Sequence, residues 1–231
     1  MLGTIVNAGA ILAGGLVGLL LRGGLKERYQ SIVMHALGLA VLFIGASSAI
    51  KGLIDPEAEA ILFILCLVLG GLLGELLNIE GRLERLGDKL QARFGGSGNL
   101  SQGFVGASLL FCVGTMAVLG SLESGMRGNY TILFAKAVLD GATAVVMAST
   151  LGAGVLLSAV SVFLYQGTLT LCASYLQNIL TASMYREMNI VGGILIFAIG
   201  LNMLNITKIK VGNYLPAMFL PIFYYLVVGA L

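Results

Sequence analysis

The sequence predicts an all-α integral membrane protein, a bundle of about eight transmembrane helices, from three observations. Of its 231 residues, 58% are hydrophobic and only 10% are charged, whereas soluble domains carry about 25% charged residues. Hydrophobic runs of about 20 residues, the length that crosses a bilayer, recur along the chain. Glycine is abundant (33 residues) and proline is scarce (3 residues), as in closely packed transmembrane helices. We therefore expect one transmembrane domain over residues 1–231, embedded in the lipid bilayer.

Eight hydrophobic segments are predicted to cross the membrane in turn. The first begins without the positive charges that precede a cleaved signal sequence, so we expect it to be retained. The fifth and sixth meet at Gly152 and are expected to form a tight helical hairpin, and Pro216 and Pro221 are expected to bend the last. The predicted spans are residues 2–21, 32–50, 59–77, 103–121, 130–150, 154–175, 189–206 and 212–231.

Residues 79–94, between the third and fourth spans, are predicted to form an amphipathic helix. Hydrophobic residues recur there at helical spacing, and the opposite face alternates acidic and basic residues. A helix of this kind lies in the membrane interface or packs beneath the bundle. It is either a solvated linker or a surface on which a partner docks. The hydrophobic face consists of Ile79, Leu83, Leu86, Leu90 and Phe94.

Positive charges predict the orientation of the bundle. Because loops rich in lysine and arginine stay in the cytoplasm, we expect both termini outside the cytoplasm and the protein in the cell inner membrane. Nine such residues fall on the predicted cytoplasmic side: Arg22, Lys26, Arg28, Arg82, Arg85, Lys89, Arg93, Lys208 and Lys210. Three fall on the other side: Lys51, Arg127 and Arg186.

Two similar octets suggest an inverted repeat. Gly38–Gly45 (GLAVLFIG) resembles Gly193–Gly200 (GILIFAIG), and the predicted topology runs them in opposite directions, as in transporters built from inverted halves. Spans one to three and six to eight would then be related. Gly106–Gly114 is also similar but runs parallel to the first octet. The pattern therefore fits either a repeat or the common use of glycine in membrane helices.

Composition argues against several classes of function. A net charge of +2 without a dense basic run gives no electrostatic footprint for nucleic acid. One histidine (His35) and three scattered cysteines (Cys66, Cys112 and Cys172) lack metal-ligand spacing, and no HExxH or GxSxG pattern occurs. We therefore expect no enzyme activity, no metal site and no cofactor.

Lys136 and Asp140 are charged residues inside the hydrophobic fifth span, four positions apart. A charge at the bilayer centre costs about 2.5–3.5 kcal/mol on insertion scales, so intramembrane charges usually have a function. Helical rise places Lys136 about 9 Å and Asp140 about 15 Å from the outer end of the span. The lysine can therefore reach the surface, whereas the aspartate must pair, bind a proton or face water. This favours a proton- or cation-linked site, with a purely structural ion pair as the alternative.

Buried amides extend this candidate pathway. Gln166 lies near the middle of the sixth span, beside Gly167. This pattern is typical of a broken helix lining a polar cavity, or else of a hydrogen bond between helices. Asn202 and Asn205 form a polar pair nearer the cytoplasmic end of the seventh span. Asn7 is a weaker candidate, because it lies close to the predicted outer surface.

Two surface features complete the candidates. Glu123 and Arg127 flank Gly125 between spans four and five, where they form either an external gate or a solvated turn. Small residues at a spacing of four predict close helix packing, within one subunit or in a homo-oligomer. These stripes are Ala10, Gly14 and Gly18 in the first span and Gly70 and Gly74 in the third.

Three stretches of the chain carry a family resemblance. They are the opening GTIVNAGAILAGGLVGLLLRGGL, the central CVGTMAVLGSLESGMRGNYTILFAKAVLDGATAVVMASTLGAGVLLSA and the closing NIVGGILIFAIGLNMLNI. Together they resemble the bacterial inner-membrane family catalogued as domain of unknown function 554, over nearly the whole chain. The resemblance implies a polytopic bacterial membrane protein, often described as a transporter or simply as uncharacterised. It implies no substrate and no catalytic residue.

The residues favour a secondary transporter of a small solute or ion. Asp140 would be the coupling group, Gln166 and Asn202 would line the path, and Lys136 would bias the charge state of Asp140. Two alternatives remain. An oligomeric channel or pore would use the same polar residues without a coupling step, and a membrane scaffold would dock a partner through helix 79–94.

Overall fold

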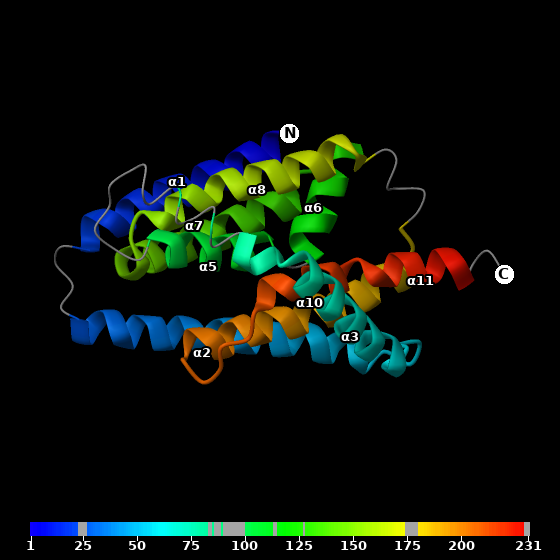
Figure 1. Ribbon diagram of the computed structural model, residues 1–231. Coiled ribbons are helices and arrows are strands. Elements are labelled where there is room, and N and C mark those ends of the chain that lie inside the picture. Colours follow the sequence, from blue (N-terminus) through cyan, green and yellow to red (C-terminus); the bar gives the residue numbers. More distant parts are fainter. Residues whose placement is uncertain are drawn as a thin grey trace. The chain divides into compact units, whose positions relative to one another are not determined.

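Helices make up the regular structure of the chain. The computed structural model describes residues 1–22, 27–82, 85, 89, 100–112, 115–126, 128–173 and 180–228, and those residues include no strand (Figure 1). This agrees with the predicted all-α class. The helices are α1 (Leu2–Arg22), α2 (Glu27–Leu53), α3 (Ala60–Leu77), α5 (Leu100–Cys112), α6 (Thr115–Met126), α7 (Thr131–Leu151), α8 (Gly154–Leu171), α10 (Ala182–Met203), the 3₁₀ helix η1 (Val211–Met218) and α11 (Leu220–Val228).

Five helices of the described chain are long and apolar enough to cross a membrane. A sixth crossing results if α5 and α6, which are bent by 75°, count as one span. Two more predicted spans coincide with shorter apolar helices, Gly38–Leu53 and Val211–Val227. Membrane-spanning helices are therefore present, and the count of eight stays a prediction. The five are Leu2–Leu21, Ile61–Arg82, Thr131–Leu151, Gly154–Leu171 and Ala182–Met203.

Local sequence explains where two of these helices begin and end. α7 ends at Leu151 because Gly152 adopts a φ of 82°, which favours glycine, and its N–H binds the carbonyl of Ala148. The predicted break at Gly152 is thus confirmed. α10 begins at Ala182 instead of the predicted 189, because the hydroxyl of Thr181 caps its first turn by accepting the Met184 N–H at 3.3 Å. Arg186 and Glu187 therefore lie inside this helix.

The chain folds into two compact units that alternate along the sequence. The first unit comprises Met1–Leu37, Arg82–Cys112 and Met116–Tyr175, and so contains α1, α5, α6, α7 and α8. The second comprises Gly38–Gly81, Val113–Thr115 and Leu176–Leu231, and so contains most of α2, α3, α10, η1 and α11. The single domain predicted over residues 1–231 stays a prediction.

In the first unit, α1 and α7 run parallel and in close contact. Gly3 of α1 lies against Leu133, and Gly18 lies against the backbone of Val145. Between these points a Cβ atom at Gly14 would overlap the carbonyl of Gly141. Helices with small residues at the crossing can approach backbone to backbone. The predicted Gly14–Gly18 stripe is thus a packing surface within one chain.

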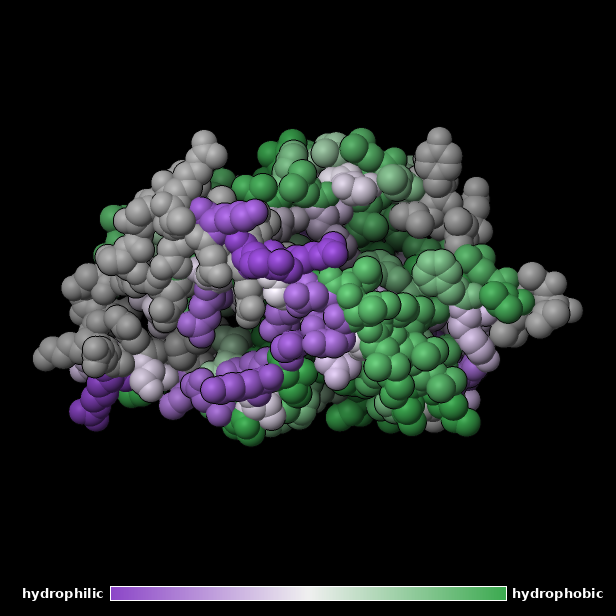
Figure 2. All heavy atoms as spheres, in the orientation of Figure 1, coloured by the Kyte–Doolittle hydropathy of each residue, from purple (hydrophilic) through white to green (hydrophobic). Residues whose placement is uncertain are grey.

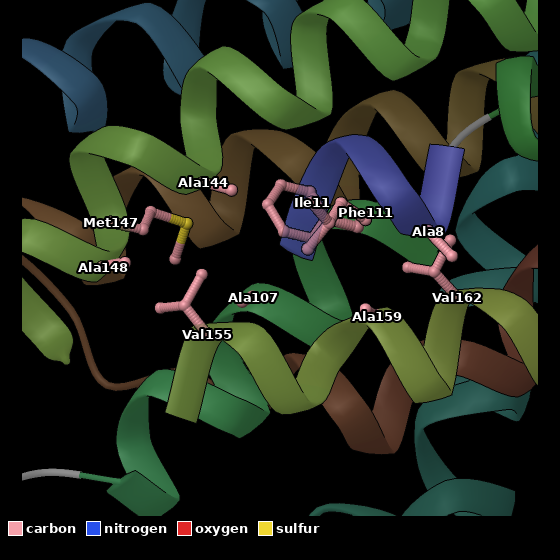
Figure 3. Packing of buried hydrophobic residues seen from close by; sticks show 10 residues of the cluster. All are labelled: Ala8, Ile11, Ala107, Phe111, Ala144, Met147, Ala148, Val155, Ala159 and Val162. Carbon is pink, nitrogen blue, oxygen red and sulfur yellow. The ribbon is translucent and has the colours of Figure 1, made fainter. Parts of the chain in front are cut away.

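α8 runs antiparallel to α1 and parallel to α5. Together with α7, these three helices enclose the core of the first unit (Figures 1 and 3). Small side chains from all four helices surround a few large ones, which fits the close helix spacing. The core residues are Ala8, Ile11, Ala107, Phe111, Ala144, Met147, Ala148, Val155, Ala159 and Val162.

In the second unit, α2 and α10 pack antiparallel. Gly38 lies against Leu204, Gly45 against the backbone of Phe197, and Gly52 against Ile190. The two similar octets thus face each other in opposite directions, as an inverted repeat requires, although the relation between the halves stays a prediction. α3 packs against η1 in the same manner, with Gly70 against Ala217 and Gly74 against Asn213.

The surface along α3 is strongly hydrophobic, as the green surface around this helix in Figure 2 shows. Leu72 and Leu76 are among its most exposed side chains. Such a surface fits contact with lipid acyl chains. α3 ends at Leu77, and Asn78, which follows it, has a φ of 47°. Most of the predicted interfacial helix 79–94 lies outside the described residues.

Candidate functional site

Lys136 and Asp140 form an ion pair in the interior of the first unit. Lys136 Nζ lies 2.6 Å from Asp140 Oδ2, one turn apart on α7. The two residues are only 6% and 7% exposed. The predicted escape of Lys136 toward the surface is therefore wrong: its ammonium turns inward to the carboxylate. An ionised pair at this burial needs additional hydrogen bonds to offset its desolvation.

Asn7 of α1 supplies one of these bonds. It also links the pair, which lies on α7 alone, to two further helices, α1 and α8. Its Nδ2 donates to Asp140 Oδ2 at 3.0 Å and to Gln166 Oε1 of α8 at 3.3 Å. Asn7 and Gln166 are both fully buried. We call these four residues, Asn7, Lys136, Asp140 and Gln166, the Asp140 site.

Helix packing places the four side chains together. Because α1 and α7 run parallel with Ala10 as well as Gly14 beside Gly141, Asn7, one turn before Ala10 on the same face of α1, reaches Asp140. Because α8 runs antiparallel to α1, Gln166 near its end meets Asn7 near the start of α1. The glycine contact therefore sets the distance at which Asn7 and Asp140 bind each other.

Two polar atoms of the Asp140 site are buried without a partner among the described residues. They are Asn7 Oδ1, an acceptor, and Gln166 Nε2, a donor. Buried polar groups are nearly always hydrogen-bonded, and those that are not call for bound water, an ion or a ligand. The site thus has the capacity to bind a small molecule that both donates and accepts.

The sequence predicted some of the residues of this site. Asp140, Lys136 and Gln166 are brought together, as expected from their depth in neighbouring spans. Asn7, ranked lower because of its distance from the midplane, is the residue that joins the three helices. The signal for it was present: Asn7 shares its helical face with the Ala10–Gly14–Gly18 stripe.

Asn202 and Asn205 serve a turn in the second unit. The side chain of Asn202 donates to the carbonyl of Ile209 and accepts from the hydroxyl of Thr207 and the N–H of Ile209, at 2.6, 2.8 and 2.9 Å. Asn205 is exposed and has a φ of 56°, which asparagine tolerates better than most residues. Both residues thereby shape the chain that follows α10.

Of the predicted external gate, Glu123 is described and Arg127 lies outside the described residues. Glu123 Oε2 accepts a hydrogen bond of 2.8 Å from Asn129 Nδ2, and its carbonyl accepts from the Asn129 N–H. Asn129 in turn caps Thr131 at the start of α7. Glu123 therefore helps to order the turn before α7.

Sequence reasoning missed a second buried carboxylate, Glu187, in the second unit. It is fully buried, and its Oε1 accepts the Glu59 N–H at the start of α3, at 3.1 Å. Its neighbour Arg186 binds the carboxylate and the carbonyl of Glu57 at 2.9 and 2.6 Å. The hydropathy pattern did not place these two residues in a helix, because charged residues next to an apolar run suggest a loop.

No group of three or more histidine, cysteine, aspartate or glutamate side chains that could hold a metal ion occurs in the described parts of the chain. The Asp140 site itself offers a carboxylate, an ammonium and two amides. These groups can bind and release a proton or a small polar species.

Comparison with known proteins places this architecture in a family. Residues 2–226 match the family described as "Protein of unknown function (DUF554)". The chain is 39% identical to the uncharacterised membrane protein YdfK of Bacillus subtilis, over 96% of this chain and 94% of the relative. It is 33% identical to the uncharacterised protein YqgA of Escherichia coli, over 95% and 94%. No solved structure matches the chain.

Proposed function

Because the chain belongs to the DUF554 family of membrane proteins, whose name assigns no activity, we propose a function from the site itself: a secondary transporter of a small solute or ion, with Asp140 as its coupling group. The observation that carries this proposal is the buried Lys136–Asp140 pair, joined through Asn7 to α8. An ionisable group inside a membrane bundle is a functional candidate because it is costly to keep there.

The charge state of Asp140 controls two contacts at once. Its Oδ2 accepts both from Lys136 Nζ and from Asn7 Nδ2. A protonated carboxyl is a poorer acceptor than a carboxylate and no longer attracts the ammonium. Protonation therefore weakens both bonds and leaves Lys136 without its counter-ion.

This change extends to the packing of three helices. Asn7 belongs to α1 and also donates to Gln166 of α8, so a proton on α7 alters the contacts among all three. A ligand shifts a conformational equilibrium only by as much as it binds the two states differently. The Asp140 site provides such a difference for a proton, which is the requirement for proton-coupled transport.

Proton flux in proteoliposomes tests this proposal. The full chain is reconstituted around a pH-sensitive dye, and alkali cations, divalent cations, small carboxylates and amino acids are added in separate assays. We expect a saturable proton flux with one class. Asp140→Asn should lower it about 100-fold or more, because that variant cannot bind the coupling proton. Glu187→Gln neutralises the buried acid of the second unit and is the matched control, with flux retained.

Two results would contradict the proposal: no proton flux with any class, or full flux through a well-folded Asp140→Asn protein. Failure of this variant to accumulate in the membrane, with Glu187→Gln accumulating normally, would instead make the ion pair structural.

The proposal includes residence in the cell inner membrane with both termini outside the cytoplasm. Loop charges support this orientation. The helix directions within each unit fit eight alternating crossings, which place both termini on the same side, because such crossings make α1 and α7 parallel and α2 and α10 antiparallel. Alkaline phosphatase fused after Leu231 should be active if the C-terminus lies outside. An inactive fusion, with fluorescence from green fluorescent protein at the same position, contradicts the orientation.

A further inference from the structure

Four of the hydroxyl side chains buried in the first unit lie toward the end at which α1 begins. They are Thr4 of α1, Ser121 and Ser124 of α6, and Thr170 of α8, and none is more than 6% exposed. Neither the ion pair nor the hydrophobic core of the unit includes them. Their position relative to Asp140 indicates what they do.

Thr4 and Thr170 continue the contact between α1 and α8 by one step. Asn7 binds Gln166 at 3.3 Å, and the hydroxyls of Thr4 and Thr170 lie 3.4 Å apart. Thr4 precedes Asn7 by three residues and Thr170 follows Gln166 by four, so each lies about one turn farther along its helix. The step leads from Asp140 toward the end of the unit at which α1 begins and α8 ends.

α6 adds the two serines at the same level. Gly125 of α6 lies against the carbonyl of Thr170, and Gly120 lies against Leu133 of α7. Ser121 is one turn before Gly125 and so shares its face toward α8. Leu133 also touches Gly3 of α1, beside Thr4. Helices α1, α6, α7 and α8 therefore converge on this cluster of hydroxyls.

The two threonine hydroxyls pair with each other, whereas, in the part of the chain that the structure describes, the two serine hydroxyls lack the partner that other buried hydroxyls have. Ser121 Oγ and Ser124 Oγ have no partner among the described residues, as is true of Asn7 Oδ1 and Gln166 Nε2. By contrast, Ser158 donates to the carbonyl of Val155 at 2.6 Å, within its own helix. An unpaired buried hydroxyl destabilises the folded protein, and a bound water molecule removes this cost by supplying a hydrogen-bond partner.

Both donors and acceptors are left open along this route, and water supplies both. We propose that Thr4, Thr170, Ser121 and Ser124 line a water-filled access path by which the coupling proton reaches Asp140. That a proton moves along this path rests on the proposed function, whereas the presence of water in the path does not. Hydroxyls and waters in hydrogen-bonded sequence can pass a proton between them, and the path ends at the carboxylate that would take it up.

Cysteine reactivity with silver ion tests whether the path holds water. Cys66, Cys112 and Cys172 are replaced by alanine, and Thr4→Cys, Ser124→Cys and Ser158→Cys are introduced one at a time into the full chain in membranes. The reactive thiolate forms only where water reaches it, so we expect Thr4→Cys and Ser124→Cys to react about tenfold faster than Ser158→Cys or more. The thiol left unreacted is measured by maleimide labelling after denaturation.

Ser158→Cys is the matched control, because Ser158 is as buried as Thr4 but is bonded within its own helix. A continuous path requires both test positions to react faster than the control. Reaction at one of them alone, or at neither, overturns the proposal. The readout needs no transport, so reactive cysteines in a protein without proton flux would reject the proposed function and retain the path.

Discussion

Each unit of this protein buries one carboxylate in a helix, and the two are bound in different ways. Asp140 of the first unit is held by side chains alone, the ammonium of Lys136 and the amide of Asn7. Glu187 of the second unit also has a cationic neighbour, Arg186 Nε at 3.6 Å, but in addition it accepts a backbone N–H, that of Glu59 at the start of α3. Both are nearly or fully inaccessible to solvent.

Under the proposed function, this difference separates a contact that a proton changes from one that holds backbone. The first N–H groups of a helix have no partner within it, and Glu187 satisfies one of them for α3. Arg186 next to it holds the Glu57 segment that leads into α3. Losing these bonds releases backbone. Losing the Asp140 bonds releases only side chains, as the proposed function requires if α1, α7 and α8 are to rearrange without unfolding.

The largest expected effect is a difference in the free energy of unfolding between variants at the Asp140 pair and a variant at Glu187. Lys136→Met leaves Asp140 without a cation in an apolar interior, and removing one partner of a buried pair costs about 3–5 kcal/mol. Combining it with Asp140→Asn should recover most of that loss. Glu187→Gln keeps an acceptor for the Glu59 N–H and should cost only about 1 kcal/mol. Equilibrium unfolding in mixed micelles measures all three.

An equal loss in Lys136→Met and Glu187→Gln would place both acids in the same structural role. A double variant as unstable as Lys136→Met alone would show that the lysine acts through packing instead of through its charge.

A smaller effect is expected when a glycine at a helix contact is replaced by alanine in each unit, and the two units should then differ in proton flux. Gly14→Ala places a methyl group at the carbonyl of Gly141, and Gly45→Ala places one at the backbone of Phe197. Such overpacking costs about 1–3 kcal/mol in either unit. Only Gly14→Ala moves Asn7 away from Asp140, so only this variant should also lose proton flux. Unfolding and flux assays on the same preparations compare the two.

Gly9→Ala is the control for that comparison, because a Cβ atom at Gly9 meets no neighbour within 4 Å. It should leave the flux unchanged and the stability equal or slightly higher, since alanine favours helix over glycine. Loss of flux in Gly45→Ala equal to that in Gly14→Ala would mean that the second unit contributes to transport as directly as the first.

Particular residues show how much of the Asp140 site could be predicted from the sequence. Lys136 and Asp140 stood out because charge is rare in an apolar run, and Gln166 stood out by its depth; the structure joins all three. Asn7 ranked lower because depth was counted along single helices. Its contact with Asp140 depends on how closely α1 approaches α7, and a crossing at Gly14 and Gly141 is a property of the pair.

The same limit applies to the second unit. Asn202 has the depth of a pathway residue, but its amide is taken up by Thr207 and Ile209, three short bonds that close a local turn. Glu187 has the charge of a loop residue, but it lies inside α10 because Thr181 caps the helix before it. Hydropathy averages over such local hydrogen bonds and does not detect them.

The sequence by itself determined the membrane class, the approximate positions of the apolar helices, the break at Gly152 and the charges inside the apolar fifth span. These follow from composition and spacing, which act along one chain segment at a time. Only the tertiary structure decided that Asn7 completes the Asp140 site, that Lys136 turns inward and that four hydroxyls lead away from it. Those outcomes depend on which helix faces meet and at what distance, and backbone contact at a few glycines sets both.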